Sequence, residues 1–197
     1  MQKEINQNIA SKKEKASFTK GFIEQLELVA VFFAIVLVIF SFVCRSCVVK
    51  GDSMMNTLHN EERVIIWDLF YTPKRGDIVV IHESETLVEP IVKRVIGIPG
   101  DTVTVEHYTD GMKVTVTDKN GVKIDSFDDE EYIRYVGSLA NGHDVELLEV
   151  PEGKIFVMGD NRLNSTDSRM LGCLDSRQVL GKVIFRMTPL NKIGIVK

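Results

Sequence analysis

The stretch DIVVIHESETLVEPIVKRVIGIPGD, residues 77–101, contains two runs of β-branched and apolar residues separated by a short polar segment. The runs Asp77–His82 and Val88–Ile96 have the composition of β-strands. The residues Ile98-Pro99-Gly100-Asp101 that follow predict a turn, because proline and glycine favour turns. We therefore expect two neighbouring strands that end at a turn.

Short runs of the same kind occur on both sides of this stretch, at residues 63–68, 102–106, 112–117, 154–158 and 179–187. The dipeptide Asn120-Gly121, between Val116 and Val122, predicts a two-residue hairpin turn. A succession of short strands with turn residues between them indicates a mainly β domain.

An uncharged apolar segment, LVAVFFAIVLVIFSFVC at residues Leu28–Cys44, precedes the strands. At about 1.5 Å per residue it is just long enough to cross a bilayer as a helix. Core helices are seldom apolar on every face, and the following Arg45–Lys50 lacks the small-x-small pattern of a cleavable signal. We expect a retained transmembrane anchor over residues 21–47.

Lysines are frequent before the apolar segment, which predicts a cytoplasmic N-terminus and an extracytoplasmic remainder. They are Lys3, Lys12, Lys13, Lys15 and Lys20. Residues 1–20 are polar and are predicted to form a mobile cytoplasmic tail.

Composition excludes several classes of protein. The chain has 197 residues and a formal net charge of -4, which gives no electrostatic reason to expect nucleic acid binding. Three cysteines do not make a disulfide framework, and Cys44 and Cys47 are interpreted as small apolar helix residues rather than a redox pair. The acidic run Asp128–Glu131 is interpreted as solvated surface. No metal-ligand spacing or P-loop is present, so we expect no metal or cofactor.

Three polar segments are candidates for chemistry, although each has an ordinary alternative. In Gly51-Asp52-Ser53-Met54-Met55, the serine could simply occupy a turn. In the strand 88–96, Lys93 and Arg94 point to opposite faces. One of them therefore faces a buried side or a cleft, unless this is an edge strand with both charges solvated.

A buried lysine has a lowered pKa, because burial disfavours the cation, and a neutral lysine can take a proton from serine. The third segment, Gly159–Arg169, supplies carboxylates that can pair with arginines and hydroxyls that can orient an amine. It could equally be an exposed loop. A Ser-His-Asp triad is assembled in space and stays open, but no histidine lies in these segments; the four are His59, His82, His107 and His143.

Taken together, the segments resemble the type I signal peptidases, a serine-lysine protease family that removes secretory signal peptides. The resemblance rests on four blocks in order behind the anchor, and it covers nearly the whole chain. The blocks are Gly51-Asp52-Ser53-Met54 with Thr57-Leu58, Arg75–Val79, Lys93–Gly97 with Pro99-Gly100-Asp101, and Gly159–Arg162 with Ser165, Asp167–Arg169 and Gly172.

The resemblance implies a role for each matching residue. Ser53 matches the nucleophile, Lys93 the general base, and Ser165 a serine that hydrogen-bonds and orients the lysine. A set of structural ion pairs is matched by Asp160, Arg94, Asp167 and Arg169. Gly51 stands where some members carry a hydroxyl residue of the oxyanion hole, which leaves backbone N–H groups such as that of Ser53.

The resemblance also implies a mainly β catalytic core, residues 48–101 and 151–197, interrupted by a short β-rich insertion at 102–150. The length and the single anchor look like the enzymes of Gram-positive bacteria. The expected partners are secretory preproteins and the lipid bilayer, without nucleic acid. The family commonly has proline before Thr57, where this chain has Asn56, so the turn after the nucleophile loses a stiffening residue.

Two other functions remain. One is a signal-peptidase-like assembly factor that binds preproteins or pilin subunits without cleaving them, against which a desolvated Lys93 would count. The other is a serine-lysine autoprotease of the repressor type, which would require a DNA-binding domain where this chain has an anchor. Cleavage of a signal-peptide substrate distinguishes the first of these from a peptidase.

Overall fold

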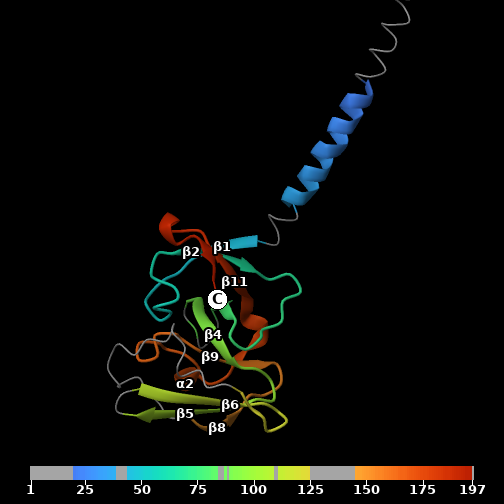
Figure 1. Ribbon diagram of the computed structural model, residues 1–197. Helices are drawn as coiled ribbons and strands as arrows, with labels where there is room; N and C mark the ends of the chain where they lie inside the picture. The colour runs from blue at the N-terminus through green and yellow to red at the C-terminus, as the bar shows by residue number, and fades with distance from the viewer. Residues whose placement is uncertain are drawn as a thin grey trace, which may run out of the picture. The chain divides into compact units, whose positions relative to one another are not determined.

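The computed structural model describes residues 20–38, 44–83, 87, 89–108, 111–124 and 145–196. Figure 1 shows the path of the chain. The chain divides into two compact units, Met1–Val43 and Cys44–Lys197.

The described part of the first unit is one helix, Lys20–Val38, which is long and apolar enough to cross a membrane. No part of it is buried within the protein. The predicted tail lies outside the described residues except for Lys20.

The anchor was predicted to extend to residue 47, but Cys44–Val48 forms strand β1 instead. Cys44 and Cys47 therefore lie on a strand, and their interpretation as helix residues is wrong. The polar pair Arg45-Ser46 ends the apolar run, and β1 pairs antiparallel with β2, with Cys47 opposite Val64. This pairing satisfies backbone groups that a helix would otherwise satisfy.

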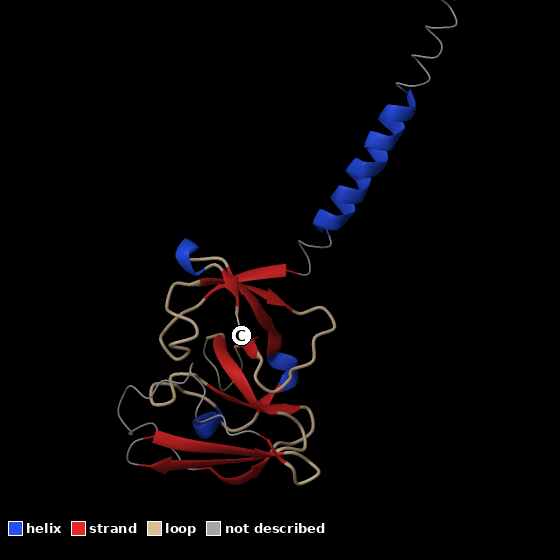
Figure 2. Cartoon of the chain, in the orientation of Figure 1, coloured by secondary structure: helices blue, strands red, loops and turns tan. Residues whose placement is uncertain are grey.

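The second unit is mainly β, as predicted, and Figure 2 shows its strands. After β1 the strands are β2 (Arg63–Trp67), β3 (Ile78–Ile81), β4 (Ile91–Gly97), β5 (Thr102–Tyr108), β6 (Gly111–Thr117), β7 (Lys123–Ile124), β8 (Val145–Glu149), β9 (Lys154–Met158), β10 (Leu174–Asp175), β11 (Val179–Arg186) and β12 (Gly194–Ile195). The helical elements are α2 (Ser168–Leu171), η2 (Ser176–Gln178) and η3 (Leu190–Lys192). Strands predicted from composition thus appear as β2, β3, β4, β5, β6, β9 and β11.

The larger sheet has the order β1-β2-β11-β3-β4-β9-β10, with β12 paired to β11. Strand β4 lies between β3 and β9, so the edge-strand alternative for Lys93 and Arg94 is wrong. Apolar cores cover both faces of β3: Ile78 and Val80 enter one, and Val79 and Ile81 enter the other. A strand buried on both faces is apolar throughout, which explains the continuous run in the sequence.

The smaller sheet has the order β7-β6-β5-β8, and its strands lie between residues 102 and 149. That residues 102–150 form an insertion stays a prediction. The inner side chains of this sheet, including Val103 and Val114, share a core with Phe156 and Met158 of β9. Figure 1 shows β5, β6 and β8 together, apart from β1, β2 and β11.

Two details of this sheet differ from expectation. Asn120-Gly121 lies in a hairpin connection, but the last pair is Thr117 with Lys123, so the loop is longer than two residues. The Asp118 carboxylate closes it by accepting from Asn120 and Val122 N–H groups. Strand β8 was not predicted from the sequence. The acidic run Asp128–Glu131 lies outside the described residues.

Candidate active site

Ser53 lies on the loop between β1 and β2, and its neighbours fix that loop to the core. Met54 and Leu58 are 1% and 0% exposed and pack among the apolar side chains of β2 and β3. Leu58 N–H donates to the Met54 carbonyl at 2.8 Å. Burial of the flanking methionine therefore holds the serine at the surface of the core.

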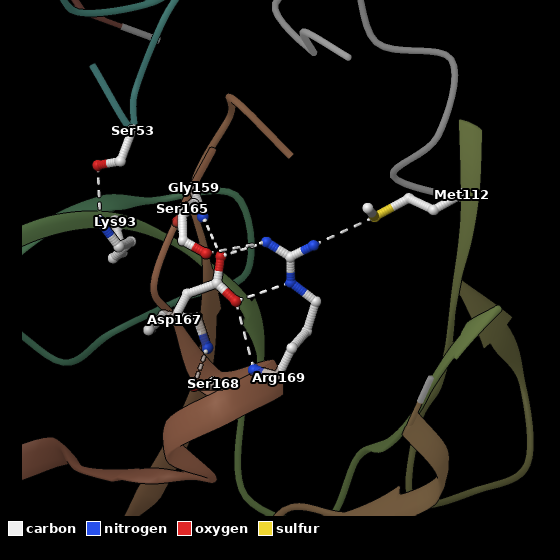
Figure 3. A network of polar contacts seen from close by, with 9 residues as sticks. Ser53, Lys93, Met112, Gly159, Ser165, Asp167, Ser168 and Arg169 are labelled. Atoms are coloured by element: carbon white, nitrogen blue, oxygen red, sulfur yellow. Dashed lines mark hydrogen bonds and ion pairs between the residues drawn. The ribbon is translucent and has the colours of Figure 1, made fainter. Parts of the chain in front are cut away.

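Lys93 lies at the middle of β4 and reaches Ser53. Its Nζ donates to Ser53 Oγ at 2.7 Å (Figure 3). The same Nζ donates to the Val92 carbonyl at 3.1 Å. The residue is only 3% exposed. The sequence pattern alone allowed either a solvated or a buried position for Lys93, and the structure shows that the side chain is buried.

Burial lowers the pKa of Lys93 from its ordinary value to about 8, because desolvation disfavours the cation. The nearby guanidinium of Arg169 lowers it further, whereas the carboxylates of Asp167 and Asp160 act in the opposite direction. A substantial fraction of the amine is therefore neutral near pH 8, with a hydroxyl within hydrogen-bond distance.

Asp167 and Arg169 form a fully buried ion pair beside the lysine (Figure 3). Arg169 Nε and Nη2 each donate to the carboxylate at 2.8 Å, and Gly159 N–H donates to it at 3.0 Å. Burial would raise the pKa of Asp167, but these hydrogen bonds and the Arg169 charge hold it below its usual range. Asp167 also caps the N-terminus of α2.

Arg94 and Asp160 form a second buried pair, with side chains 3% and 0% exposed. Arg94 Nε and Nη2 donate to the two carboxylate oxygens at 2.8 Å each, and Nη1 donates to the Gly76 carbonyl at 2.7 Å. Thr57 Oγ1 also donates to Asp160. The pair thus joins β4, the loop that carries Ser53 and Thr57, and the loop after β9.

Ser165 lines the same pocket as Ser53 and Lys93. The hydrogen bond predicted between Ser165 and Lys93 is not found among the contacts of the described residues. The Lys93 amine instead donates to Ser53 and to its own strand. Ser165 is 3% exposed, and its carbonyl accepts from Arg169. Its role in orienting the lysine stays a prediction.

An open pocket of about 280 Å³ surrounds the two central residues. It is lined by Lys50, Gly51, Asp52, Ser53, Ile91, Lys93, Asn164, Ser165 and Thr166. Gly51 has φ +81°, in the left-handed region that favours glycine, and its N–H donates to Asn60 at 2.9 Å.

The histidines whose side chains are described do not contact the serine. His59 lies 3.5 Å from Glu62, and His82 interacts with the Glu83 carbonyl. Among the described residues, the group hydrogen-bonded to the Ser53 hydroxyl is the Lys93 amine. The arrangement thus has a serine hydroxyl hydrogen-bonded to a buried amine, the geometry that activation of a serine by a basic neighbour requires.

Sequence reasoning assigned no role to Gly159, Thr57 or Asn161, although it quoted all three within motifs. Asn161 donates hydrogen bonds to the Asp52 and Ser53 carbonyls. A β-carbon on Gly159 would lie 2.4 Å from the Ser53 carbonyl. The contacts of Gly159 and Asn161 involve backbone atoms of a distant loop, which leave no pattern in side-chain type, and Thr57 meets Asp160 from far along the chain.

Comparison with known proteins gives consistent matches. The family model described as "Signal peptidase, peptidase S26" matches residues 22–188. The signal peptidase I S of Bacillus subtilis is 37% identical over 193 residues, covering 92% of this chain and 97% of the relative. The signal peptidase IB of Staphylococcus aureus is 34% identical over 191 residues, covering 88% and 93%.

A crystal structure of a signal peptidase I from Enterococcus faecalis V583 is 30% identical in sequence. The match covers 57% of this chain and 97% of that chain, with a TM-score of 0.39.

Proposed function

The chain belongs to the signal peptidase S26 family and is a type I signal peptidase, and from this premise we propose that it is a membrane-bound serine endopeptidase that cleaves signal peptides with a Ser53–Lys93 dyad. The observation that carries the proposal is the 2.7 Å hydrogen bond between Ser53 Oγ and the Lys93 amine. The lysine is almost fully buried and has a lowered pKa, as a general base working near neutral pH requires.

In the first half of the reaction, neutral Lys93 takes the Ser53 proton while Ser53 Oγ attacks the scissile carbonyl carbon. The tetrahedral intermediate collapses as the carbon–nitrogen bond breaks, and the Lys93 ammonium gives its proton to the leaving amine. The signal segment is then held on Ser53 as an ester.

In the second half, Lys93 takes a proton from water, and the resulting hydroxide attacks the ester carbonyl. Ser53 Oγ leaves and regains its proton from Lys93, which restores the neutral amine. Because Gly51 has no hydroxyl, stabilisation of the oxyanion depends on backbone N–H groups such as that of Ser53.

The substrate is expected to bind in extended form beside the serine, by addition to a strand edge. A pocket of about 280 Å³ that is open to solvent suits small side chains, such as those of A-x-A cleavage sites. The helix Lys20–Val38 would cross the bilayer once, with the lysine-rich N-terminus in the cytoplasm and the β unit outside. This places the enzyme in the membrane that holds its substrates.

The direct test is cleavage of a preprotein by the purified full-length chain in detergent or liposomes. Sequencing the new N-terminus should place the cut directly after an A-x-A site. A chain that binds the preprotein without cutting it would favour the assembly-factor alternative, although a buried amine has no purpose in a protein that only binds.

Activity should fall on acidification through about pH 8. Lys93 is the base only when neutral, and with a pKa lowered to about 8 it is mainly neutral above that pH and mainly protonated below it. We expect kcat/KM to drop about tenfold for each further pH unit below 7, measured with one preprotein at constant ionic strength. A flat profile between pH 6 and 9 would exclude Lys93 as the base.

Replacing Gly159 by alanine should reduce turnover. The added β-carbon would lie 2.4 Å from the Ser53 carbonyl and 2.3 Å from Ser165 Oγ. The loop between β1 and β2 that carries Ser53, here called the nucleophile loop, must therefore shift. A displacement of about 1 Å can cost about 100-fold in rate, and overpacking adds about 1–3 kcal/mol of destabilisation. The measurements are kcat and the thermal midpoint.

The matched control is Gly194→Ala, where an added β-carbon has no neighbour within 4 Å. It should keep the kcat and the thermal midpoint of the unaltered chain. If Gly159→Ala also keeps full turnover, the close approach of the two loops is unimportant for the reaction.

A further inference from the structure

One side chain holds the peptide unit that precedes the nucleophile. Asn161 Nδ2 donates to the Asp52 carbonyl at 3.1 Å, and Asn161 N–H donates to the Ser53 carbonyl at 3.0 Å. Two consecutive carbonyls of the nucleophile loop are therefore bound by one residue of the loop after β9. Asn161 is 3% exposed, so water competes little for these bonds.

The direction of the Asp52 carbonyl also determines the direction of the next N–H. A peptide unit is planar, and in a trans peptide such as Asp52–Ser53 the C=O and N–H groups point in opposite directions. Because the Asp52 carbonyl points to Asn161, the Ser53 N–H points away from it. In the described part of the chain this N–H has no hydrogen-bond partner, so it is available to a substrate oxygen.

Asn161 is itself firmly placed. Its carbonyl accepts from Asn164 N–H at 3.0 Å, and it follows Asp160, which is bound to Arg94 by two hydrogen bonds. Within the described residues its Oδ1 has no hydrogen-bond partner. The donor half of the amide is thus the half with a structural contact, and that contact is the Asp52 carbonyl.

We propose that Asn161 is a positioning residue for the oxyanion: its side chain orients the Asp52–Ser53 peptide so that the Ser53 N–H meets the charge that develops during attack. This inference rests on the proposed function. As the bond from Ser53 Oγ to the carbonyl carbon forms, the C=O electron pair moves onto oxygen, and a pre-oriented N–H stabilises that charge. The uncharged carbonyl of the bound substrate is stabilised little by this N–H, so the interaction raises kcat rather than lowering KM.

The test is the variant Asn161→Leu in the full-length chain. Leucine is close in size, keeps the backbone N–H bond to Ser53, and removes both the Nδ2 donor and the unpartnered oxygen. Loss of one oxyanion donor costs about 10²–10³ in kcat, so a donor that remains but is poorly oriented should cost about 10- to 100-fold. KM should stay within about twofold, and the midpoint of the pH profile should be unchanged because Lys93 is not touched.

A peptide aldehyde that ends in the cleavage-site sequence provides a second readout. Ser53 Oγ adds to the aldehyde carbon as its proton passes to Lys93, and the C=O electron pair moves onto the aldehyde oxygen, so the adduct copies the charged tetrahedral intermediate. Its Ki should weaken by the same factor as kcat/KM, while the Ki of the corresponding product peptide stays constant. Both constants are measured on whatever fraction of the chain is folded, so partial unfolding does not change their ratio.

Asn191→Leu is the matched control, because Asn191 is exposed on η3. It should behave as the unaltered chain in every measurement. An unchanged ratio of the aldehyde Ki to the product-peptide Ki in Asn161→Leu would overturn the proposal. A shifted midpoint of the pH profile, or a rise in KM without a fall in kcat, would overturn it as well. If the unaltered chain does not cleave, or if Ser53→Ala still cleaves, the proposed function has failed instead.

Discussion

Replacing Lys93 by methionine is expected to abolish preprotein cleavage, with a loss of about 10⁴-fold or more in kcat. Methionine is similar in length and apolar, so it fills the buried site but cannot accept the Ser53 proton. The fold should survive, because removing a buried amine also removes its desolvation cost. Cleavage kinetics and the thermal midpoint of the same preparation test both expectations.

Two further variants make this result specific. Ser53→Ala should cause a similar loss, and the double variant should be no worse than either, because the proposed nucleophile and base would act as one unit. Lys123→Met, at an exposed position on β7, is the matched control and should cleave normally. Residual cleavage by Lys93→Met at alkaline pH would mean that another group takes the proton.

Replacing Asp160 by alanine should destabilise the protein by about 3–5 kcal/mol. The substitution leaves Arg94, which is 2% exposed, without the carboxylate that receives its Nε and Nη2 hydrogen bonds. Thr57 loses its acceptor as well. Denaturant unfolding of the full-length chain in detergent, followed by Trp67 fluorescence, measures the change.

The exposed pair Asp175–Arg177 provides the comparison for Asp160. Arg177 is 88% exposed, and its guanidinium also binds the carboxylate through two nitrogens. Arg177→Ala should leave the unfolding transition unchanged, since solvent replaces the lost contact and Asp175 still caps η2. The double variant Arg94→Leu with Asp160→Leu should recover part of the Asp160→Ala loss. Equal effects at the two pairs would mean that burial is not what makes the first pair important.

Much of the fold was predictable because its signals are local. The runs at β2, β3 and β9 are rich in β-branched residues, and they appear within a residue or two of their predicted ends. The errors occur where tertiary pairing decides the structure. Strand β1 forms because β2 lies beside it, and the residues Cys44–Val48 alone do not predict that pairing.

The site was predictable in its residue types but not in its contacts. Alternation along β4 showed that Lys93 and Arg94 must face different ways, but not that both would be buried. Burial depends on Asp160, far along the chain, and on the loop that carries Ser53. The resemblance to a family supplied the roles that residue pattern left open.

The interior position of β4 has a consequence for how the protein can fail. Hydrogen-bonded ladders flank this strand on both sides, to β3 and to β9. The backbone of β4 cannot leave its place unless part of the central ladder breaks, so local breathing of a surface loop does not displace the strand that carries Lys93. The position of the lysine and the cooperative integrity of the sheet are consequently lost in the same event, so a molecule whose central sheet has opened no longer holds Lys93 beside Ser53.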